Sequence, residues 1–203
     1  MENHDIKKII ISIIVVLTTM VSFAQNQVIA DSSTHLTFKG VPIDGTLSEY
    51  VSKMKQNGFT HIGTEGGTAI LNGEFAGFKN CIVGVVTLER KNLVSAIHVM
   101  FPRRDTWSLL SSDYFSLKEM LTEKYGKPSE YVERFESYSE PKDDGSKMMS
   151  VRLDKCKYYT IYNTDKGDIE LLIYGGVNGR FVRLSYFDKI NGGIAKAKAV
   201  DDL

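Results

Sequence analysis

The chain has 203 residues, of which 25 are basic and 25 acidic, and 42% are hydrophobic. This composition is that of an ordinary globular protein and excludes a collagen, a coiled coil or a disordered tail. The formal net charge is zero. The chain therefore lacks the broad positive field that nucleic-acid binding usually needs, and we expect no nucleic-acid partner.

The amino terminus has the pattern of an export signal. Lys7 and Lys8 precede an uncharged run of 13 residues, 9–21, and Ser22 and Ala24 put small residues at the positions that precede a cleavage site. The alternative is an uncleaved anchor, but 13 residues cover only about 20 Å of a membrane core roughly 30 Å thick. We predict removal of residues 1–24, no stable membrane insertion afterwards, and a periplasmic, secreted or outer-surface location.

The first half of the remaining chain reads as a strand, a helix and four further strands. A strand is predicted over 35–42. A helix is predicted over 46–57, because Thr46 and Glu49 make a capping box and Gly58 supplies the left-handed residue that ends it. Apolar alternation between turn residues predicts the four strands that follow, at 60–65, 68–75, 81–89 and 93–101.

The second half repeats the order of a helix followed by strands. Asp105 or Thr106 can cap the helix, Gly126 ends it, and Pro128 prevents it from resuming. The segment 139–147, rich in charge and containing Pro141 and Gly145, reads as a long mobile hairpin tip. Strands are predicted at 130–137, at 148–162 with a bulge or turn near 154–155, at 169–174 and at 181–187.

These elements predict an α+β fold made of two tandem units, each with one helix and four strands. The units span 25–102 and 103–190, and a tail covers 191–203. We expect their antiparallel sheets to join edge to edge or to pack side by side, with both helices on one face. Residues 194–203 form either a brief helix or a frayed end.

Three segments carry a resemblance to a known family: FKGVPIDG at 38–45, GEFAG at 73–77 and KYGKP at 124–128. Together they resemble an uncharacterised family of secreted proteins from gut-dwelling Gram-negative bacteria. The resemblance implies a periplasmic or outer-surface location and no particular activity. In outline, the predicted order of elements is also similar to the β-lactamase inhibitor proteins, in which two such units present a sheet face to a partner.

The two cysteines, Cys81 and Cys156, leave two states open. In an oxidising compartment they can form a disulfide that closes a loop of 74 intervening residues and contributes about 4 kcal/mol. Alternatively, both are buried free thiols, since the sequence does not place their Cα atoms within bonding distance.

The sequence offers little sign of catalysis. His35, His61 and His98 lie in none of the spacings typical of metal sites, and no serine lies in a GxSxG motif. The glycines at 63–67 precede a predicted strand, whereas a phosphate-binding loop precedes a helix. We therefore expect no cofactor and no metal, and we assign no catalytic residue.

Strand alternation predicts an aromatic face on the side of the sheet away from the core. If Ile169, Leu171 and Ile173 point inward, their neighbours point outward, and the same holds on either side of Val182 and Leu184. Tyr158 and Tyr162 share one face of their strand, and the sequence leaves open which face that is. The candidate binding residues are Tyr158, Tyr162, Leu172, Tyr174, Phe181, Arg183 and Phe187.

Aromatic residues and arginine on an uncovered sheet are typical of protein-recognition surfaces. In the alternative, the carboxyl-terminal segment, the 139–147 hairpin or a second copy of the chain covers this face. The function expected from the sequence is that of an exported, non-enzymatic binding module for a protein, peptide or glycan. An envelope hydrolase with an unrecognised site, or a structural envelope protein that self-associates as a homodimer, are the other hypotheses.

Overall fold

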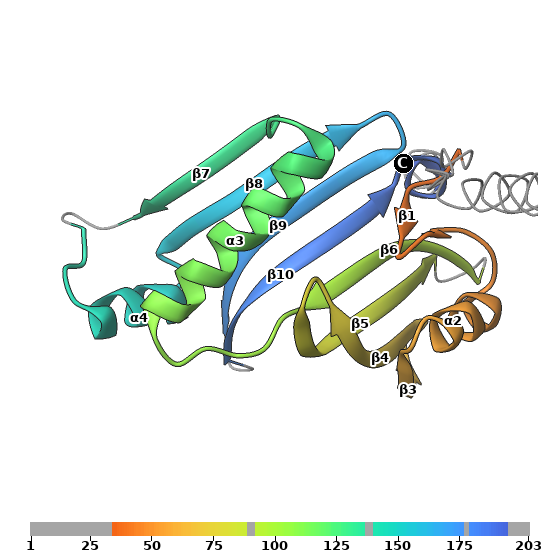
Figure 1. Ribbon diagram of the computed structural model, residues 1–203, viewed down its shortest axis with the longest axis horizontal. Helices are drawn as coiled ribbons and strands as arrows, with labels where there is room; N and C mark the ends of the chain where they lie inside the picture. Colours follow the sequence, from red (N-terminus) through yellow and green to blue (C-terminus); the bar gives the residue numbers. More distant parts are fainter. Residues whose placement is uncertain (1–33, 89–91, 137–139, 177–178, 195–203) are drawn as a thin grey trace, which may run out of the picture. The chain divides into compact units, whose positions relative to one another are not determined.

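The computed structural model describes residues 34–88, 92–136, 140–176 and 179–194 (Figure 1). Its contacts divide the chain after Ser32, and residues from Ser33 onward form one compact unit. The predicted signal at 1–24 and the last nine residues of the tail lie outside the described residues.

The first half contains one helix and four long strands. Helix α2 (Leu47–Gln56) begins at the expected capping box, in which Thr46 and Glu49 each bind the backbone N–H of the other. Gly58, with a φ of 86°, follows the end of the helix. The strands are β3 (Thr60–Glu65), β4 (Thr68–Phe75), β5 (Phe78–Leu88) and β6 (Leu93–Met100).

The second half repeats this order with one additional helix. Helix α3 (Trp107–Tyr125) begins after Thr106, whose side chain accepts a hydrogen bond from Leu109 N, and ends at Gly126. The remaining elements are β7 (Glu130–Phe135), α4 (Asp144–Arg152), β8 (Cys156–Thr164), β9 (Gly167–Gly176) and β10 (Gly179–Asp188).

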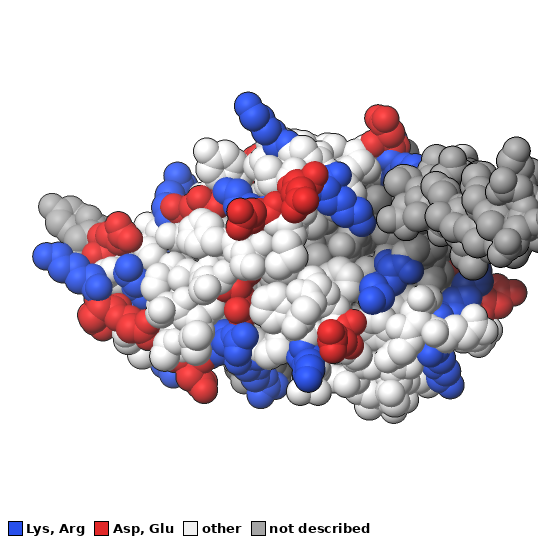
Figure 2. Space-filling view, in the orientation of Figure 1, with Lys and Arg blue, Asp and Glu red and all other residues white. Residues whose placement is uncertain are grey.

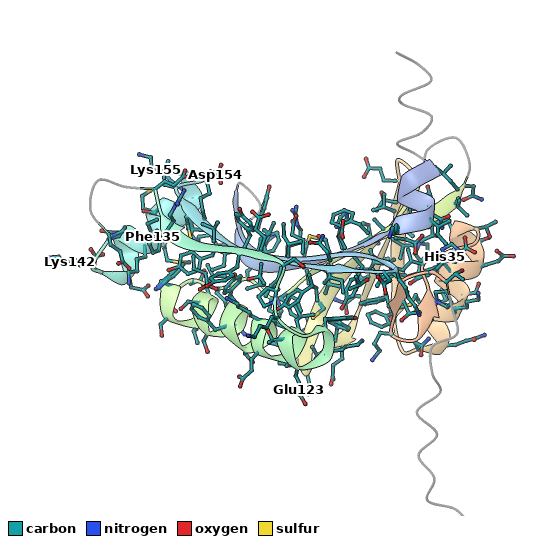
Figure 3. All side chains as sticks on the ribbon, turned by 90° about the horizontal axis from the view of Figure 1, so that it is seen from above. His35, Glu123, Phe135, Lys142, Asp154 and Lys155 are labelled. Atoms are coloured by element: carbon teal, nitrogen blue, oxygen red, sulfur yellow. The ribbon has the colours of Figure 1, made fainter. Side chains whose placement is uncertain are left out.

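All eight long strands belong to a single antiparallel sheet in the order β3-β4-β5-β6-β10-β9-β8-β7. The two halves join edge to edge, because the last strand of each half, β6 and β10, pair with each other. The first strands, β3 and β7, form the outer edges. Figure 3 shows α3 on one side of the sheet. The expected α+β class, with helices packed against an antiparallel sheet, is confirmed.

One hydrophobic core lies between the helices and the sheet. Strands β4, β5, β6, β8, β9 and β10 contribute alternate residues, and in β9 and β10 these are the predicted inward-pointing ones. Tyr50 and Met54 of α2 and Leu110, Tyr114 and Leu117 of α3 are completely or almost completely buried. The strand residues that face them include Leu71, Val83, Val85, Ile97, Val99, Ile169, Leu171, Ile173, Val182 and Leu184.

The segment 139–162 differs from its prediction. Residues 144–152 form helix α4 instead of a hairpin tip and the start of a strand, and β8 begins only at Cys156. Asp143 caps the helix by accepting a hydrogen bond from Ser146 N at 2.8 Å. Met148 and Val151 are buried in the core, so tertiary packing stabilises a helix that charge and glycine content argue against.

The segment 35–42 also differs, because it is not one continuous strand. Two short strands, β1 (Thr37–Phe38) and β2 (Val41–Pro42), pair with each other. Lys39 and Gly40 connect them with φ values of 53° and 76°. Positive φ at both central residues is typical of a two-residue hairpin turn, which reverses the chain where the sequence predicts an extended segment.

Candidate functional site

Helices α2, α3 and α4 leave one side of the sheet uncovered, and residues 189–194, directly after β10, are also helical. Helices α2, α3 and α4 all bury their apolar residues in the single core. The alternate strand residues point the other way, and we call the surface that they form on β4, β5, β6, β10, β9 and β8 the open face. Its larger side chains include Ile70, Ile82, Val86, His98, Met100, Lys157, Tyr159, Ile161, Glu170, Leu172, Tyr174, Phe181, Arg183 and Phe187.

Figure 2 shows the opposite, helix-covered face, where acidic and basic side chains are interspersed and neither sign forms a continuous area. Such a mixed surface is what a solvated face usually carries.

An aromatic pair lies at one end of the open face. Tyr174 and Phe181 are opposite each other on β9 and β10, with ring centroids 5.1 Å apart. Phe181 is only 7% exposed, whereas Tyr174 is 38% exposed. The buried ring therefore supports the exposed one, and Tyr174 can offer a rigid surface to a ligand at little cost in side-chain entropy.

Arg183 lies beside this pair and holds a charge on the same face. Its guanidinium carbon is 5.6 Å from the centroid of the Tyr174 ring. Its Nη2 donates a hydrogen bond to Glu170 Oε1 at 3.3 Å, while its Nε is buried without a partner among the described residues. Arginine next to an aromatic ring is a common feature of binding hot spots.

His98 and Phe187 lie further along the seam between β6 and β10. Phe187 is 38% exposed, and its ring meets that of His98 edge to face at 5.6 Å. His98 Nδ1 is 2.9 Å from the hydroxyl oxygen of Ser185. Burial lowers the pKa of His98 below its ordinary value of 6.5, and the charge of Arg183 lowers this pKa further, whereas Glu170 raises it.

The pair of His98 and Ser185 has the residue types of a hydrolytic dyad but not the access that one needs. Ser185 is 0% exposed, so its hydroxyl cannot reach a substrate carbonyl. We interpret the pair as a satisfied polar contact that joins the two halves of the sheet.

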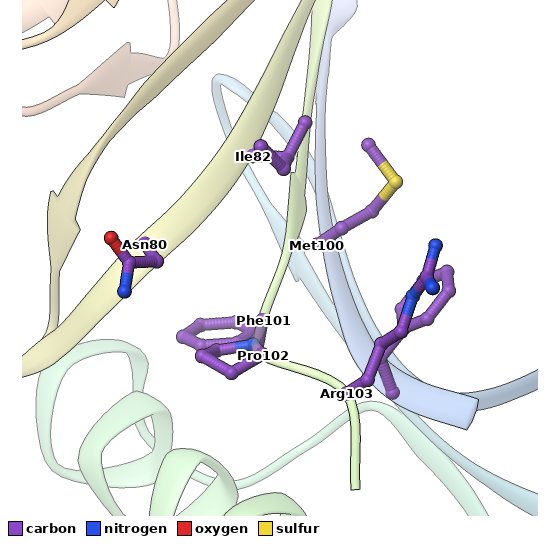
Figure 4. A pocket seen from close by; sticks show the side chains of 7 residues that line it. Asn80, Ile82, Met100, Phe101, Pro102 and Arg103 are labelled. Atoms are coloured by element: carbon purple, nitrogen blue, oxygen red, sulfur yellow. The ribbon is translucent and has the colours of Figure 1, made fainter. Parts of the chain in front are cut away.

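Two shallow pockets flank the aromatic pair. Figure 4 shows one of about 470 Å³, whose lining includes Ile82, Met100, Phe181 and Arg103. The other, of about 430 Å³, lies over β8 and β9, and its lining includes Tyr174. Since Phe181 lines one pocket and Tyr174 the other, the stacked rings separate them. The first hollow has a mostly apolar lining with Arg103 beside it, whereas the lining of the second is more polar and includes Asp154 and Lys157.

The structure places the predicted site residues on two different faces. Leu172, Tyr174, Phe181, Arg183 and Phe187 all lie on the open face, as the alternation of β9 and β10 predicts. Met100, His98 and Ile82 also belong to this face but were not predicted as site residues. The alternation of β5 and β6 predicts that these three residues point away from the core. The sequence did not show that β6 pairs with β10, and so it did not place them beside Phe181 and Arg183.

Tyr158 and Tyr162 do not belong to the open face. Tyr162 is buried, and its hydroxyl donates to Lys118 O at 3.0 Å. Tyr158 packs against Trp107 and Phe135 beneath α3. Strand β8 pairs Thr160 with the core residue Leu171. Since residues two positions apart in a strand share a face, Tyr158 and Tyr162 face the helices together with Thr160.

Cys81 and Cys156 are both buried free thiols. Cys81 lies on β5 and Cys156 on β8, and β6, β10 and β9 lie between these strands. Four strand spacings amount to about 19 Å, which exceeds the reach of a disulfide. The disulfide alternative is therefore wrong for this fold. Burial raises the pKa of Cys81 to about 11 and that of Cys156 to about 12.

A polar cluster that the sequence did not suggest joins the two ends of the described chain. Asp188 is 1% exposed and accepts hydrogen bonds from Leu36 N at 2.8 Å and Asn191 N at 2.9 Å. His35 Nδ1 is 3.0 Å from the same carboxylate. Asn191 donates in turn to Ile43 O and Val94 O. His35, Leu36 and Ile43 lie about 150 residues from their partners, and Val94 lies 97 residues from Asn191, so no local motif could reveal these contacts.

No group of three or more metal-ligating side chains comes together in the part of the chain that the structure describes. Within the same residues, no helix has the length and apolar content needed to cross a membrane. Comparison with models of protein families, with curated proteins and with solved structures finds no match to this chain.

Proposed function

We propose that this protein is an exported, non-enzymatic binding module whose ligand docks on the open face. The observation that carries the proposal is the exposure of Tyr174 and Phe187, each 38%, on the side of the sheet that α2, α3 and α4 leave uncovered. Arg183 lies on the same side. Exposed aromatic rings with a neighbouring arginine form the usual centre of a protein-binding surface.

The ligand class that suits this surface is a protein, a peptide or a glycan. Aromatic rings accept the apolar face of a sugar or an apolar side chain, and the Arg183–Glu170 pair offers both a donor and an acceptor at the rim. Export is supported by the pattern of residues 1–24, in which a short apolar run follows two lysines and precedes a small-residue cleavage site.

A direct test combines capture with substitution on the open face. The mature chain, beginning at Gln25, is immobilised and exposed to an envelope extract of its source cells. Tyr174→Thr with Phe187→Thr is expected to weaken capture of a specific species at least about tenfold, because hot-spot aromatics supply much of the binding energy. Mass spectrometry of the exported chain is expected to give Gln25 as its first residue.

The matched control carries equally exposed apolar residues on the helix side. Leu109 and Met120 on α3 are 52% and 41% exposed, and Leu109→Gln with Met120→Gln should leave capture unchanged. Equal recovery with both double variants would overturn the assignment of the site. A change in the size of the protein itself, seen only with the open-face variant, would favour self-association through that face instead.

A further inference from the structure

The two edges of the sheet are built differently. In Figure 1, β7 lies at one border of the sheet, and the strand order ends there among the described residues. The other edge, β3, has a register shift between His61 and Gly63. Bulges of this kind protect edge strands from pairing. Strand β7 pairs with β8 in regular register over all six of its residues, so it keeps the flat geometry that a further strand needs.

The hydrogen-bond pattern shows which residues of β7 are available to another strand. Glu136 N donates to Lys155 O at 2.7 Å, so this pair is a hydrogen-bonded one. Such pairs recur at every second residue of an antiparallel ladder. The even-numbered residues of β7 therefore bind β8, and the backbone groups of Tyr131, Glu133 and Phe135 point to the free edge.

The side chains of β7 are complementary to a second copy of the same strand in one register. If two β7 strands pair antiparallel about a two-fold axis through Val132, then Tyr131 and Glu133 of opposite copies form hydrogen-bonded pairs, which uses the free backbone groups. On the open face, Glu130 of each copy then lies opposite Arg134 of the other. The symmetry creates this pair of opposite charges twice.

Shifting the axis by one residue removes this complementarity. An axis through Glu133 sets the two Glu133 carboxylates opposite each other and Glu130 opposite Glu136. Like charges directly opposite in a sheet are destabilising. The charges therefore favour the axis through Val132 over the axis through Glu133.

The structure also holds Glu130 in position for this contact. The hydroxyl of Tyr159, on the neighbouring strand, donates to Glu130 Oε1 at 2.6 Å. Arg134 is exposed and makes no ion pair with another described residue. One charge is thus oriented by its own chain, and the other is available to a partner.

We propose that two copies of this chain associate through their β7 strands, with Val132 on the two-fold axis and Glu130 paired with Arg134 across the interface. The dimer has one continuous sheet, and the open faces of both copies lie on the same side. If the open face binds a ligand as proposed above, the dimer presents two such faces to a partner with repeated epitopes. The inference does not depend on the proposed function of the open face.

The competing interpretation is that the charges of β7 keep other strands away, which is a common role of charges on edge strands. A protective role of this kind does not require that the opposite charges of Glu130 and Arg134 lie at equal distances from Val132. Charge reversal distinguishes the two interpretations, because a protective role predicts no recovery when the two charges are exchanged.

The test measures the molar mass of the mature chain by sedimentation equilibrium over a range of concentrations. One pair of short strands buries little area, so we expect a dimer with a dissociation constant on the order of 10–100 µM. Glu130→Arg and Arg134→Glu should each weaken the dimer about tenfold or more, because each places like charges opposite each other twice.

The decisive experiment exchanges the charges of residues 130 and 134. The double variant Glu130→Arg with Arg134→Glu should dimerise like the wild type. An equimolar mixture of the two single variants should form heterodimers, detected by native mass spectrometry with chains of different mass. A monomeric wild type at the highest concentration, or single variants that dimerise as tightly as the wild type, would overturn the proposal.

A backbone variant separates dimerisation from folding. Tyr131→Pro removes only an N–H that points to the free edge, so the ladder with β8 and the far-ultraviolet circular dichroism should be retained while the dimer is lost. The open-face variant Tyr174→Thr with Phe187→Thr should keep the dimer. If that variant instead abolishes dimerisation, the copies associate through the open face and the β7 interface is wrong.

Discussion

His98 lies on the open face, where its ring contacts Ser185 and Phe187. Burial among these neighbours disfavours the charged imidazolium, and the guanidinium of Arg183 adds repulsion, so the pKa of His98 lies below 6.5 in the folded chain. A histidine in the unfolded chain binds its proton at higher pH than this one does.

This difference predicts how stability depends on pH. Well above pH 6.5, His98 is neutral in both the folded and the unfolded chain, so it does not make the free energy of unfolding depend on pH. As the pH falls below 6.5, His98 binds a proton in the unfolded chain before it does so in the folded chain. The free energy of unfolding therefore decreases with falling pH until the pH reaches the pKa of His98 in the folded chain. Urea midpoints of the wild type at about pH 7.5 and 5.0 should therefore differ more than those of His98→Gln. An equal difference in both proteins would contradict the role assigned to His98.

At the scale of elements, α2 and α4 show what local sequence can and cannot predict. Helix α2 carries its own start and stop signals, since the capping box at Thr46 and the glycine at Gly58 need no other part of the chain. Helix α4 has a capping aspartate, Asp143, but its nine residues include Gly145 and two serines. A short segment of this composition becomes helical only because Met148 and Val151 find a core to enter.

The packing of α4 against β9 requires a glycine at position 175. A methyl group on Gly175 would clash with the backbone oxygen of Val151, and a backbone atom cannot move aside as a side chain can. Gly175→Ala should therefore reduce the free energy of unfolding by about 1–3 kcal/mol, measured by urea denaturation.

The matched control is Gly63→Ala on the edge strand β3. Gly63 also has ordinary backbone dihedrals, and a methyl group there would meet no atom within 4 Å. Its effect should stay within about 0.5 kcal/mol. Similar losses in both variants would show that the general cost of replacing glycine, rather than contact with α4, explains the result.

At the scale of the whole molecule, the seam between β6 and β10 makes the two halves one cooperative unit. Five residue pairs join these strands, and the core cluster is continuous across them. The hydrogen bonds of Asp188 and Asn191 add a second connection, between the end of the second half and the start of the first.

We therefore expect a destabilising substitution in one half to destabilise the other half as well. Leu71 is completely buried on β4, in the first half, whereas Trp107, the only tryptophan, lies on α3 in the second. Leu71→Ala should lower the stability reported by Trp107 fluorescence by about 2–5 kcal/mol. Circular dichroism should give the same midpoint. An unchanged fluorescence midpoint would mean that the halves unfold independently.

The open face illustrates how far strand alternation leads. The period of two residues in β9 and β10 correctly separated Leu172, Tyr174 and Phe181 from the core, because turns at both ends bound each strand. Tyr158 and Tyr162 could not be placed in the same way. Their face depends on where β8 begins, and α4 determines that starting point.

Local sequence by itself determined the fold class, the two long helices and the inward or outward direction of most strand residues. These features depend on caps, turns and periodicity within about ten residues, where the backbone responds directly to its own side chains. The tertiary structure alone decided the joining of β6 to β10, the helical state of 144–152, the separation of Cys81 from Cys156 and the Asp188 cluster. Each of these depends on contacts between distant residues, whose free energy appears only when the whole core closes.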